Sequence, residues 1–293
     1  MVPFSPTAPL KPRRVVLLGG GGFLGRHVGH YFRGRDVTCV SLGRRDLDLA
    51  AGNADVLADN LKADDAVVML SVASGRAVAE EAYDANLRMA NAVVTAVKLR
   101  PVAHVTYVSS EAVYGTAGAG GAVDESATPL PPDTYGAMHL ARERLFEALE
   151  GNVAILRPVM VLGADDPHNA YGPNRFVRDA LAGGLVTLFG EGDDVRDYVS
   201  AEDFAAVVGA VVACAGHGTL NVASGEPLPA RRAAEICFAA LGLPVRMQSV
   251  PRSQPASARI YDTALRRKML PHVFVKPAAA AIQELAAGAR KLQ

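Results

Sequence analysis

A group of glycines near the start of the chain has a spacing suited to holding an anion. The apolar run Arg14–Leu18 leads directly into Gly19, Gly20, Gly21 and Gly22, and Gly25 follows. The spacing satisfies both G-x-G-x-x-G and G-x-x-G-x-x-G. Without Cβ atoms such a backbone turns tightly, lies against a pyrophosphate and brings the next helix close to its strand. The strand before the glycines and the helix after them favour a dinucleotide site over a simple turn.

The end of the next β-rich stretch, Asp36–Leu42, bears on which dinucleotide would bind. A carboxylate about twenty residues past the glycines holds the ribose 2′-hydroxyl of NAD, whereas an arginine suits the 2′-phosphate of NADP. Here the strand is followed by Arg44 and Arg45, and the first acidic residue after the strand is Asp46. This favours NADP over NAD, with Arg44 as the phosphate ligand. Two arginines in a loop are also typical of a solvated surface.

Tyr135 and His139 are candidates for chemistry on a predicted helix. They stand four residues apart, so both side chains lie on one helical face. Such a pair is equally typical of an ordinary helix face. Ser71 and Ser110 each come at the end of a predicted strand, although serines there also serve as turn formers and helix caps.

A parallel sheet is needed to bring these residues together, and the chain alternates strands and helices accordingly. Apolar strands are predicted at Asp65–Val72 and His104–Val108, with a long helix from about Ala77 to Leu99 between them. This alternation predicts an α/β fold with a doubly wound parallel sheet. Ligands of such sheets bind beyond the carboxyl ends of the strands, where Ser71 and Ser110 fall.

The composition argues against several kinds of partner. Of 293 residues, 50% are hydrophobic, and 30 basic residues balance 30 acidic ones. Neither nucleic acid nor an anionic membrane is expected to bind through bulk charge. Apolar tracts such as Phe204–Ala215 are too short to cross a bilayer. The cysteines and histidines lack disulfide or metal-ligand spacing, which predicts no metal site and buried thiols in a reducing cytoplasm.

A set of short motifs occurs in a fixed order between about residues 13 and 265. The motifs are Gly19–Gly25, Asp65–Val72, Asn86, Val108–Gly115, Tyr135–Gly136, Leu156–Pro158, Leu188–Gly192, Val195–Val199 and Asp203. Jointly they resemble an extended short-chain dehydrogenase/reductase of the NAD-dependent epimerase/dehydratase family, which acts on nucleotide sugars. The resemblance implies a Rossmann-type doubly wound sheet with a smaller C-terminal α+β substrate domain. It also implies a homodimer formed through the helices around Asn86 and Tyr135.

The resemblance implies a role for each matching residue. Tyr135 matches the catalytic tyrosine, which exchanges a proton with a sugar hydroxyl, and Ser110 matches the serine that hydrogen-bonds the same oxygen. Arg196 matches an arginine that pairs with the substrate diphosphate, and Arg259 is a looser match. The implied substrate ligands are Ser110, Glu111, Asn174, Arg196 and Arg259. The implied cofactor ligands are Gly19, Gly20, Gly22, Phe23, Leu24, Gly25, Arg44, Asp48, Leu49, Leu70, Ser71, Val72, Tyr135 and His139, with Asp48 and Leu49 near adenine.

His139 departs from the family pattern, which has lysine four residues after the tyrosine. That lysine holds the nicotinamide ribose, and its charge lowers the tyrosine pKa. A histidine can bind a ribose but is mostly neutral near pH 7. Three alternatives follow. His139 substitutes for the lysine, another group supplies the charge, or the chain is a dinucleotide-binding protein with little or no catalysis.

A second departure concerns the type of reaction. Dehydratases of the family carry two acids after the serine or threonine, and here Glu111 is followed by Ala112, so a dehydratase is not expected. The short segment around Asp46–Leu49 favours a 4-keto-sugar reductase, while the overall motif set is shared with 4-epimerases. Both reactions stay open.

The resemblance also implies how the chain is divided into domains. Residues 1–12 are expected to be a disordered lead. Residues 13–162 and 197–224 are expected to form the NAD(P)-binding domain, and residues 163–196 and 225–293 the substrate domain.

Overall fold

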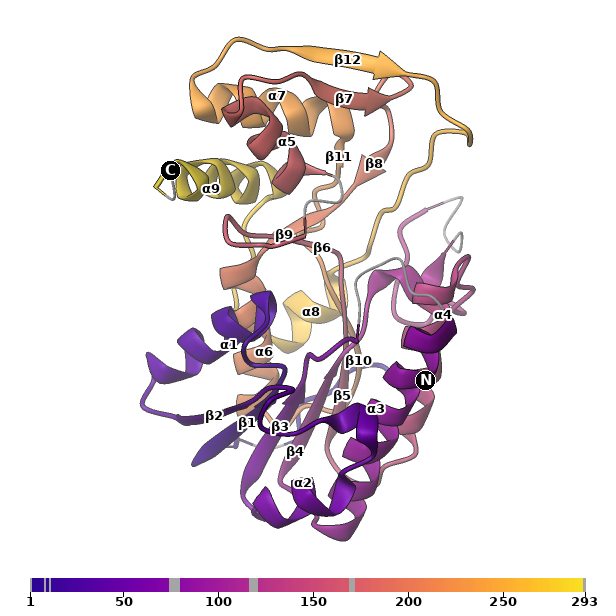
Figure 1. Cartoon of the computed structure of the whole chain (residues 1–293), viewed down its shortest axis with the longest axis vertical. Coiled ribbons are helices and arrows are strands. Elements are labelled where there is room, and N and C mark those ends of the chain that lie inside the picture. The colour runs from indigo at the N-terminus through magenta and orange to yellow at the C-terminus, as the bar shows by residue number, and fades with distance from the viewer. Residues whose placement is uncertain are drawn as a thin grey trace.

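A parallel sheet of six strands organises one half of the molecule (Figure 1). The computed structural model describes residues 2–7, 9–10, 12–73, 80–115, 121–168 and 172–291. The strands lie in the order β10-β5-β4-β3-β1-β2 and all pair in parallel. Their bounds are β1 Arg14–Leu18, β2 Thr38–Leu42, β3 Asp65–Met69, β4 His104–Val108, β5 Val153–Pro158 and β10 Gly218–Val222. Because β2 and β3 flank β1 on opposite sides, the strand order reverses there, which confirms the predicted doubly wound fold.

Alternating side chains of each strand enter the cores on the two faces of the sheet. In β1, Val15 and Leu17 join one cluster, while Val16 and Leu18 join the other. Helices α1 (Phe23–Arg33) and α6 (Ala201–Ala213) cover the first face; α2 (Ala54–Asn60), α3 (Glu80–Leu99) and α4 (Thr134–Glu147) cover the second. The predicted first turn of α3, residues 77–79, lies outside the described residues.

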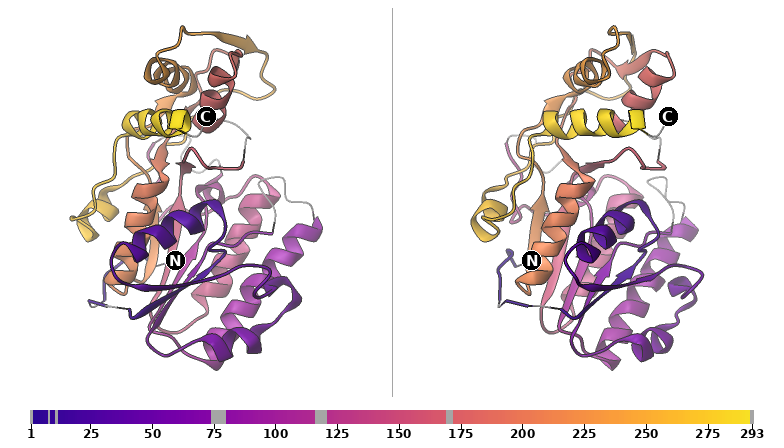
Figure 2. Two further views of the ribbon diagram at one scale, coloured as in Figure 1. Left: turned by 60° about the vertical axis from the view of Figure 1, so that its left-hand side comes forward. Right: turned by 90° about the vertical axis from the view of Figure 1, so that its left-hand side faces the viewer.

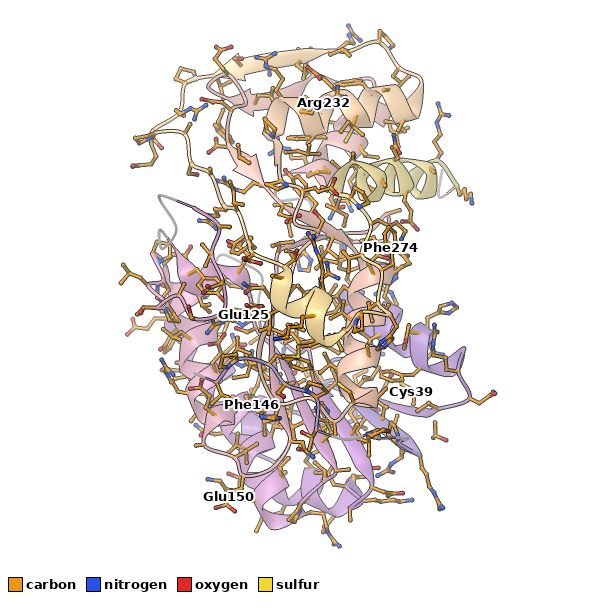
Figure 3. All side chains as sticks on the ribbon, turned by 180° about the vertical axis from the view of Figure 1, so that it is seen from behind. Cys39, Glu125, Phe146, Glu150, Arg232 and Phe274 are labelled. Atoms are coloured by element: carbon orange, nitrogen blue, oxygen red, sulfur yellow. The ribbon has the colours of Figure 1, made fainter. Side chains whose placement is uncertain are left out.

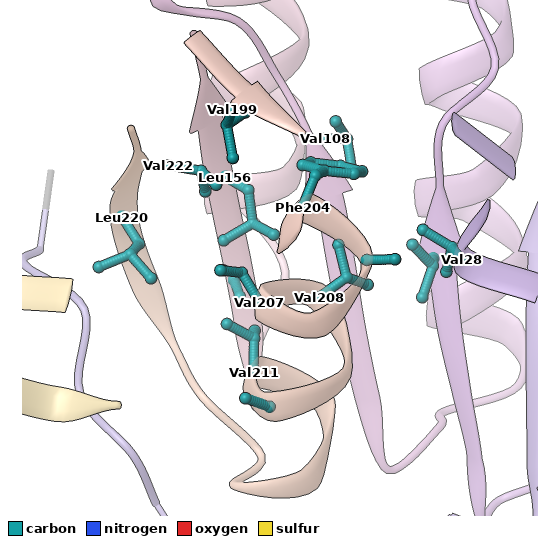
Figure 4. Packing of buried hydrophobic residues seen from close by; sticks show 14 of the residues in the cluster. Val28, Val108, Leu156, Val199, Phe204, Val207, Val208, Val211, Leu220 and Val222 are labelled. Carbon is teal, nitrogen blue, oxygen red and sulfur yellow. The ribbon is translucent and has the colours of Figure 1, made fainter. Parts of the chain in front are cut away.

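Figure 4 shows how α6 packs on the first face of the sheet. Val207, Val208 and Val211 of the helix lie among Leu156 of β5 and Leu220 of β10. All five side chains are buried. The long apolar stretch of α6 is therefore explained by burial against the sheet.

Helices α5, α7 and α9 gather at the end of the molecule opposite α2 (Figures 1 and 2). They share a separate apolar core. The helices span α5 Pro173–Leu181, α7 Ala230–Leu241 and α9 Ala278–Lys291. Short strand pairs accompany them: β7 Val186–Phe189 with β12 Met247–Val250, β8 Val195–Arg196 with β11 Leu228–Pro229, and β6 Met160–Leu162 with β9 Tyr198–Ser200. Residues 163–196 and 225–260 supply most of this part.

The segment after residue 260 corrects the predicted division of the chain. Helix α8 (Ala264–Met269) packs against β10, and Tyr261, Leu270 and Val275 belong to the core of the sheet. Seen from behind, α8 lies between the two halves of the molecule (Figure 3). Apolar residues here cover the first face of the sheet before the chain returns to α9.

The N-terminal lead is ordered where it is described, and its predicted disorder is wrong. Phe4 is buried in the core of the sheet, and its backbone N–H donates to the Thr219 carbonyl at 2.9 Å. Ser5 exchanges backbone hydrogen bonds with His217. One large apolar side chain and pairing along the edge strand β10 offset the entropy of ordering the segment.

Among the helices of the described part of the chain, none has both the length and the apolar character needed to cross a lipid bilayer.

Candidate active site

A cavity of about 660 Å³ opens at the carboxyl ends of the strands. Segments that follow five of the six sheet strands contribute to its wall, which is the place where doubly wound sheets bind ligands. The contributions are Gly19 and residues 21–25 after β1, Gly43 and Arg44 after β2, Leu70, Ser71 and Val72 after β3, residues 108–111 from the last residue of β4 onward, and residues 158–161 from the last residue of β5 onward. Tyr135, His139, Asp166, His168 and Asn174 complete one side.

The glycine turn is shaped by close backbone contacts. Gly19 has φ +91°, and a Cβ there would lie 2.9 Å from the Ser71 backbone nitrogen. A Cβ on Gly25 would lie 2.2 Å from the Gly19 carbonyl oxygen. Gly22 is the N-cap of α1 and no side chain caps this end, so the first N–H groups of the helix, which begins at the cavity wall, are not taken by a side-chain cap. This is the arrangement that accepts a phosphate.

The residues present fit a dinucleotide. The Ser71 hydroxyl oxygen is buried and has no hydrogen-bond partner among the described residues, although it belongs to a residue of the cavity wall. A buried hydroxyl without a partner is costly, and a ribose hydroxyl would satisfy it. Phe23, Leu24 and Val72 supply apolar surface beside the turn.

The predicted adenine-side residues are only partly brought to the cavity. Arg44 lines it with an exposed side chain, its Nε 3.8 Å from Asp48. Asp48 itself caps a short turn by accepting a hydrogen bond from the Ala50 backbone, and Leu49 is buried in the core beneath α3. Asp48, Leu49 and Gly20 do not line the cavity.

Tyr135 is placed by the start of α4. The Asp133 carboxylate caps the helix by accepting from the Gly136 backbone N–H at 2.8 Å. A Cβ on Gly136 would lie 2.5 Å from the Ala112 carbonyl oxygen, so the helix packs tightly on the turn Glu111–Tyr114. Ser110 caps that turn, its Oγ accepting from Ala112 at 3.2 Å. The backbones of α4 and of the turn Glu111–Tyr114 are therefore in contact. Tyr135 and Ser110 reach the cavity from these two segments.

His139 is almost fully buried, with 1% of its surface exposed, and its ring lies edge-on to Tyr135 at 4.7 Å between centroids. Its Nδ1 lies 2.7 Å from the Tyr107 hydroxyl. Burial raises the pKa of Tyr107, so that residue stays a neutral phenol. The hydrogen bond fixes the ring of His139 at the cavity wall.

A buried ion pair supports the strand ends beneath the site. Arg157 of β5 donates from Nη2 to Glu143 of α4 at 2.5 Å, and both side chains are fully buried. The Ser109 hydroxyl donates to the same carboxylate at 2.6 Å. Burial opposes the charge of Arg157, but its hydrogen bonds to Glu143 raise its pKa overall. This network ties β4, β5 and α4 together next to Ser110.

The predicted diphosphate ligands meet in a smaller hollow beside the main cavity. Arg196 and Arg259 line it together with Glu111 and Tyr261. Arg259 lies 3.1 Å from the Glu111 carboxylate, which also accepts from the Tyr261 hydroxyl at 2.7 Å. Burial and the nearby Arg259 charge lower the pKa of Arg196. Two cations held close together favour an anionic ligand.

Asn174 lines the main cavity, as Glu111 does, but the side-chain amide of Asn174 already forms hydrogen bonds within the protein. It donates to Asp166 at 2.6 Å and accepts from the Gly163 backbone at 3.3 Å, so it holds the loop that follows β6. Asp166 and His168 of that loop were not predicted as site residues, and no motif spacing marks them.

Metal-ligating groups do not cluster anywhere in the ranges that the structure describes. The three cysteines are free; Cys237 is buried, and Cys39 and Cys214 are half-buried.

Comparisons with known proteins agree with this geometry. The model of the NAD dependent epimerase/dehydratase family matches residues 15–223. A dTDP-6-deoxy-L-talose 4-dehydrogenase (NAD(P)(+)) of Kitasatospora kifunensis is 28% identical over 269 residues, 84% of this chain and 85% of that protein. A UDP-glucose 4-epimerase of Mycolicibacterium smegmatis is 28% identical over 264 residues, 79% of this chain and 83% of that protein.

Solved structures extend the likeness to the whole fold. The UDP-N-acetylglucosamine 4-epimerase from Bacillus cereus superposes with a TM-score of 0.81 at 24% identity, over 94% of this chain and 99% of that one. The resemblance seen in the sequence motifs is thus confirmed by the family match and by the fold. The chain belongs to the NAD-dependent epimerase/dehydratase family, a group of NAD(P)-dependent enzymes of the extended short-chain dehydrogenase/reductase type.

Proposed function

We propose that the chain is an NAD(P)-dependent enzyme that interconverts a hydroxyl and a ketone at carbon 4 of a nucleotide-diphosphate sugar. It does so as a 4-epimerase or as a 4-keto-sugar reductase. The observation that carries the proposal is that Tyr135 and Ser110 line one cavity with the glycine turn. Two relatives support carbon 4 as the reacting position of the sugar, since one is named a 4-dehydrogenase and the other a 4-epimerase.

The proton chemistry belongs to two side chains. A bound nicotinamide supplies the hydride acceptor or donor. Tyr135 takes the proton from the sugar hydroxyl in the oxidative direction and returns it in the reductive one. The Ser110 hydroxyl hydrogen-bonds the same oxygen and steadies the charge that develops there. His139, whose ring is oriented by Tyr107, binds the nicotinamide ribose.

The substrate diphosphate is proposed to bind Arg196 and Arg259. Both guanidinium groups are permanently charged and can donate in pairs to phosphate oxygens. In the structure Arg196 donates to the Ser257 hydroxyl and carbonyl at 2.8 Å, and Arg259 contacts Glu111. The sugar then lies between this hollow and Tyr135, since Glu111 lines both.

The proposal extends to the cofactor, the cellular location and the oligomeric state. NADP is proposed over NAD because Arg44 lines the cavity after β2, whereas the nearby Asp46 and Asp48 do not line it. A cytoplasmic location is proposed because its thiols are free. A homodimer through α3 and α4, which pack side by side, is testable by light scattering.

The test measures loss of nicotinamide absorbance when the protein and NADPH meet a panel of nucleotide-linked 4-keto sugars, with NADH in parallel. A second assay follows conversion of UDP-glucose to UDP-galactose without added cofactor. Turnover in either assay that collapses in Tyr135→Phe, while NADPH binding persists, supports the enzyme. Tyr135→Phe with full turnover overturns the assigned role.

A second candidate is a dinucleotide-binding protein without catalysis. The observation that favours it is His139, which stands in place of the family lysine. It is supported if the parent protein binds NADPH but gives no Tyr135-dependent turnover on any sugar of the panel.

A further inference from the structure

A cluster of charged side chains joins helix α1 to residues 163–168, the 163–168 loop, which follows β6. Asp165 of this loop accepts a hydrogen bond from Arg26 Nη2 at 2.8 Å and lies 2.9 Å from Nε2 of His27. On the other side of the ring, Nδ1 of His27 lies 3.3 Å from the Glu202 carboxylate of α6. The His27 ring therefore stands between two carboxylates that come from different segments of the chain.

The 163–168 loop also lies on the first turn of α1, beside the glycine turn. Arg26 donates from Nη1 to the Gly21 carbonyl at 3.1 Å and from Nη2 to the Asp165 carbonyl at 3.2 Å, so one guanidinium bonds both backbones. A Cβ on Gly163 would lie 2.5 Å from Cε2 of Phe23, so the backbone of the loop packs directly on that ring.

The 163–168 loop and the glycine turn both belong to the wall of the main cavity. Gly21 and Phe23 line it from the start of α1, and Asp166 and His168 line it from the loop. Asp166 directly follows Asp165 and accepts from the His168 backbone N–H at 3.0 Å, so the contacts of Asp165 act next to residues of the wall. The cluster thus fixes one part of the wall to another. Because a dinucleotide is proposed to bind the glycine turn, the hold on the loop affects the hold on that ligand.

The strength of the cluster depends on the charge of His27. An imidazolium has an N–H on each side and can donate to Asp165 and Glu202 together. A neutral imidazole has one N–H and turns a lone pair toward the other carboxylate. The hydrogen bond with Glu202 outweighs the effect of burial and, together with that to Asp165, raises the pKa of His27. The cluster is therefore strongest with the ring protonated and weakens as the pH rises through this raised pKa.

The neighbouring charges favour the ionised form of both carboxylates. Burial alone would raise the pKa of Asp165, but the hydrogen bonds from His27 and Arg26 lower it overall. The hydrogen bond with His27 likewise lowers the pKa of Glu202, and Lys276 adds to that effect. Further titratable groups on the surrounding elements are His30 of α1, which is exposed, and Asp203 of α6 and Glu284 of α9, which both pair with Lys276. Near neutral pH, His27 is thus the member of the cluster whose charge changes.

We propose that His27 and Arg26 are positioning residues for the dinucleotide: with His27 protonated, they hold the 163–168 loop against α1 and slow the release of the bound cofactor. The inference rests on the proposed dinucleotide site and is independent of which sugar is converted. The Asp165 and Glu202 side chains are partly exposed, at 37% and 54%, so each ion pair contributes modestly. A change of about threefold in the rate of cofactor release is therefore expected.

The first experiment follows the His27 ring by NMR in the cofactor-free protein. The carbon-bound ring proton of each histidine is titrated, and the signal that is missing in His27→Gln belongs to His27. Its midpoint is expected above the ordinary histidine value of about 6.5, and it is expected to fall by about half a pH unit or more in Glu202→Gln and in Asp165→Asn. A parent midpoint at or below the ordinary value, or one that neither substitution changes, overturns the proposal.

The second experiment measures release of the cofactor by stopped flow. Protein loaded with NADPH or NADH is mixed with an excess of the oxidised cofactor, and the loss of bound-nucleotide fluorescence gives the rate at about pH 6 and about pH 9. The parent protein is expected to release about threefold faster at the higher pH, and His27→Gln is expected to show the faster rate at both. NADH is included because it lacks the 2′-phosphate, a group that itself titrates near pH 6.

Two further variants sharpen the test. His30→Gln removes an exposed histidine one turn along the same helix and is expected to behave as the parent. Asp165→Asn removes one carboxylate of the cluster and is expected to release quickly at both pH values although His27 is intact, which keeps the proposal testable if His27→Gln does not fold. Circular dichroism establishes folding. Equal pH dependence in the parent and in His27→Gln, or slow release by Asp165→Asn at the lower pH, contradicts the proposal.

Because release of the cofactor needs no sugar, these measurements separate two kinds of failure. If no sugar is converted but the rate of release depends on His27 as expected, the positioning role stands and the proposed reaction fails. If sugar is converted through Tyr135 but His27→Gln releases the cofactor as the parent does, only the role of His27 and Arg26 fails.

Discussion

The Glu111 carboxylate lies 3.1 Å from the Arg259 guanidinium and so neutralises part of the hollow proposed to bind a diphosphate. Glu111 follows β4 and Arg259 lies 148 residues later, so the ion pair joins two segments that are far apart in the sequence. Tyr261 donates to the same carboxylate, and burial together with the nearby charge of Glu111 raises the Tyr261 pKa.

Glu111→Gln is expected to tighten binding of UDP about fivefold, because it removes a negative charge beside Arg259 and Arg196 and keeps an oxygen for Tyr261. Isothermal titration with UDP at low ionic strength measures the change. Arg259→Leu is the opposite control and should weaken binding. If Glu111→Gln binds UDP more weakly, Glu111 orients Arg259 rather than opposing the phosphate.

Gly25→Ala is expected to abolish measurable NADPH binding, because the new methyl group would lie 2.2 Å from the Gly19 carbonyl and 2.6 Å from the Gly20 Cα. Both neighbours are backbone atoms of the turn and cannot move aside independently. Gly34→Ala, at the other end of α1, is the matched control: its nearest contact would be an ordinary 3.5 Å. Fluorescence titration with NADPH gives both affinities. Equal binding by the two variants would contradict the proposed pyrophosphate site.

Arg44→Ala is expected to weaken NADPH binding about tenfold and to leave NADH binding unchanged, because only NADPH carries the 2′-phosphate. Arg45 is the matched control: it is also exposed but does not line the cavity. Dissociation constants for both cofactors in both variants decide the matter. Equal losses for NADPH and NADH would remove Arg44 as the phosphate ligand.

The glycine turn and the parallel sheet could be predicted because their signals are local. The strand β1 and its turn are contiguous in the sequence, and alternating residues of β1 enter two cores. By contrast, the order of the N-terminal lead depends on β10, more than two hundred residues later, which pairs with it and covers Phe4. No pattern within the N-terminal lead itself predicts that it pairs with β10.

The burial of Arg142 illustrates the same limit near the site. Its spacing from Tyr135 is readable as i, i+7, but an arginine on a helix face is ordinarily solvated. Only the packing of α4 against the end of β3 shows that the side chain is buried on the Ser71 carbonyl. Likewise, Asp48 fits a cofactor motif in the sequence, yet its carboxylate caps a turn in the fold.

The stability of the protein is expected to fall between pH 6.5 and about pH 4 because of His104. Burial lowers the pKa of His104 to about 4, and Nε2 lies 2.8 Å from the Gly216 carbonyl oxygen. The folded state therefore binds this proton less readily than the unfolded state, so its contribution is complete above pH 6.5 and is lost progressively below. The loss approaches about 3 kcal/mol near pH 4. Urea unfolding across this range should show a smaller drop for His104→Gln; parallel curves for the two proteins would contradict the assignment.

Arg157→Leu is expected to destabilise the protein by about 3–5 kcal/mol, because Glu143 would remain buried without its cation. Removing both partners in Glu143→Leu/Arg157→Leu should recover much of that loss, since no buried charge is then left alone. The Ser109 hydroxyl, which donates to Glu143, loses its acceptor in the double variant, so recovery is expected to be incomplete. Urea unfolding of the parent, both single variants and the double variant measures the coupling between the two residues. Additive effects would mean that the pair contributes nothing jointly, and the support it gives to β4 beside Ser110 would then come from packing alone.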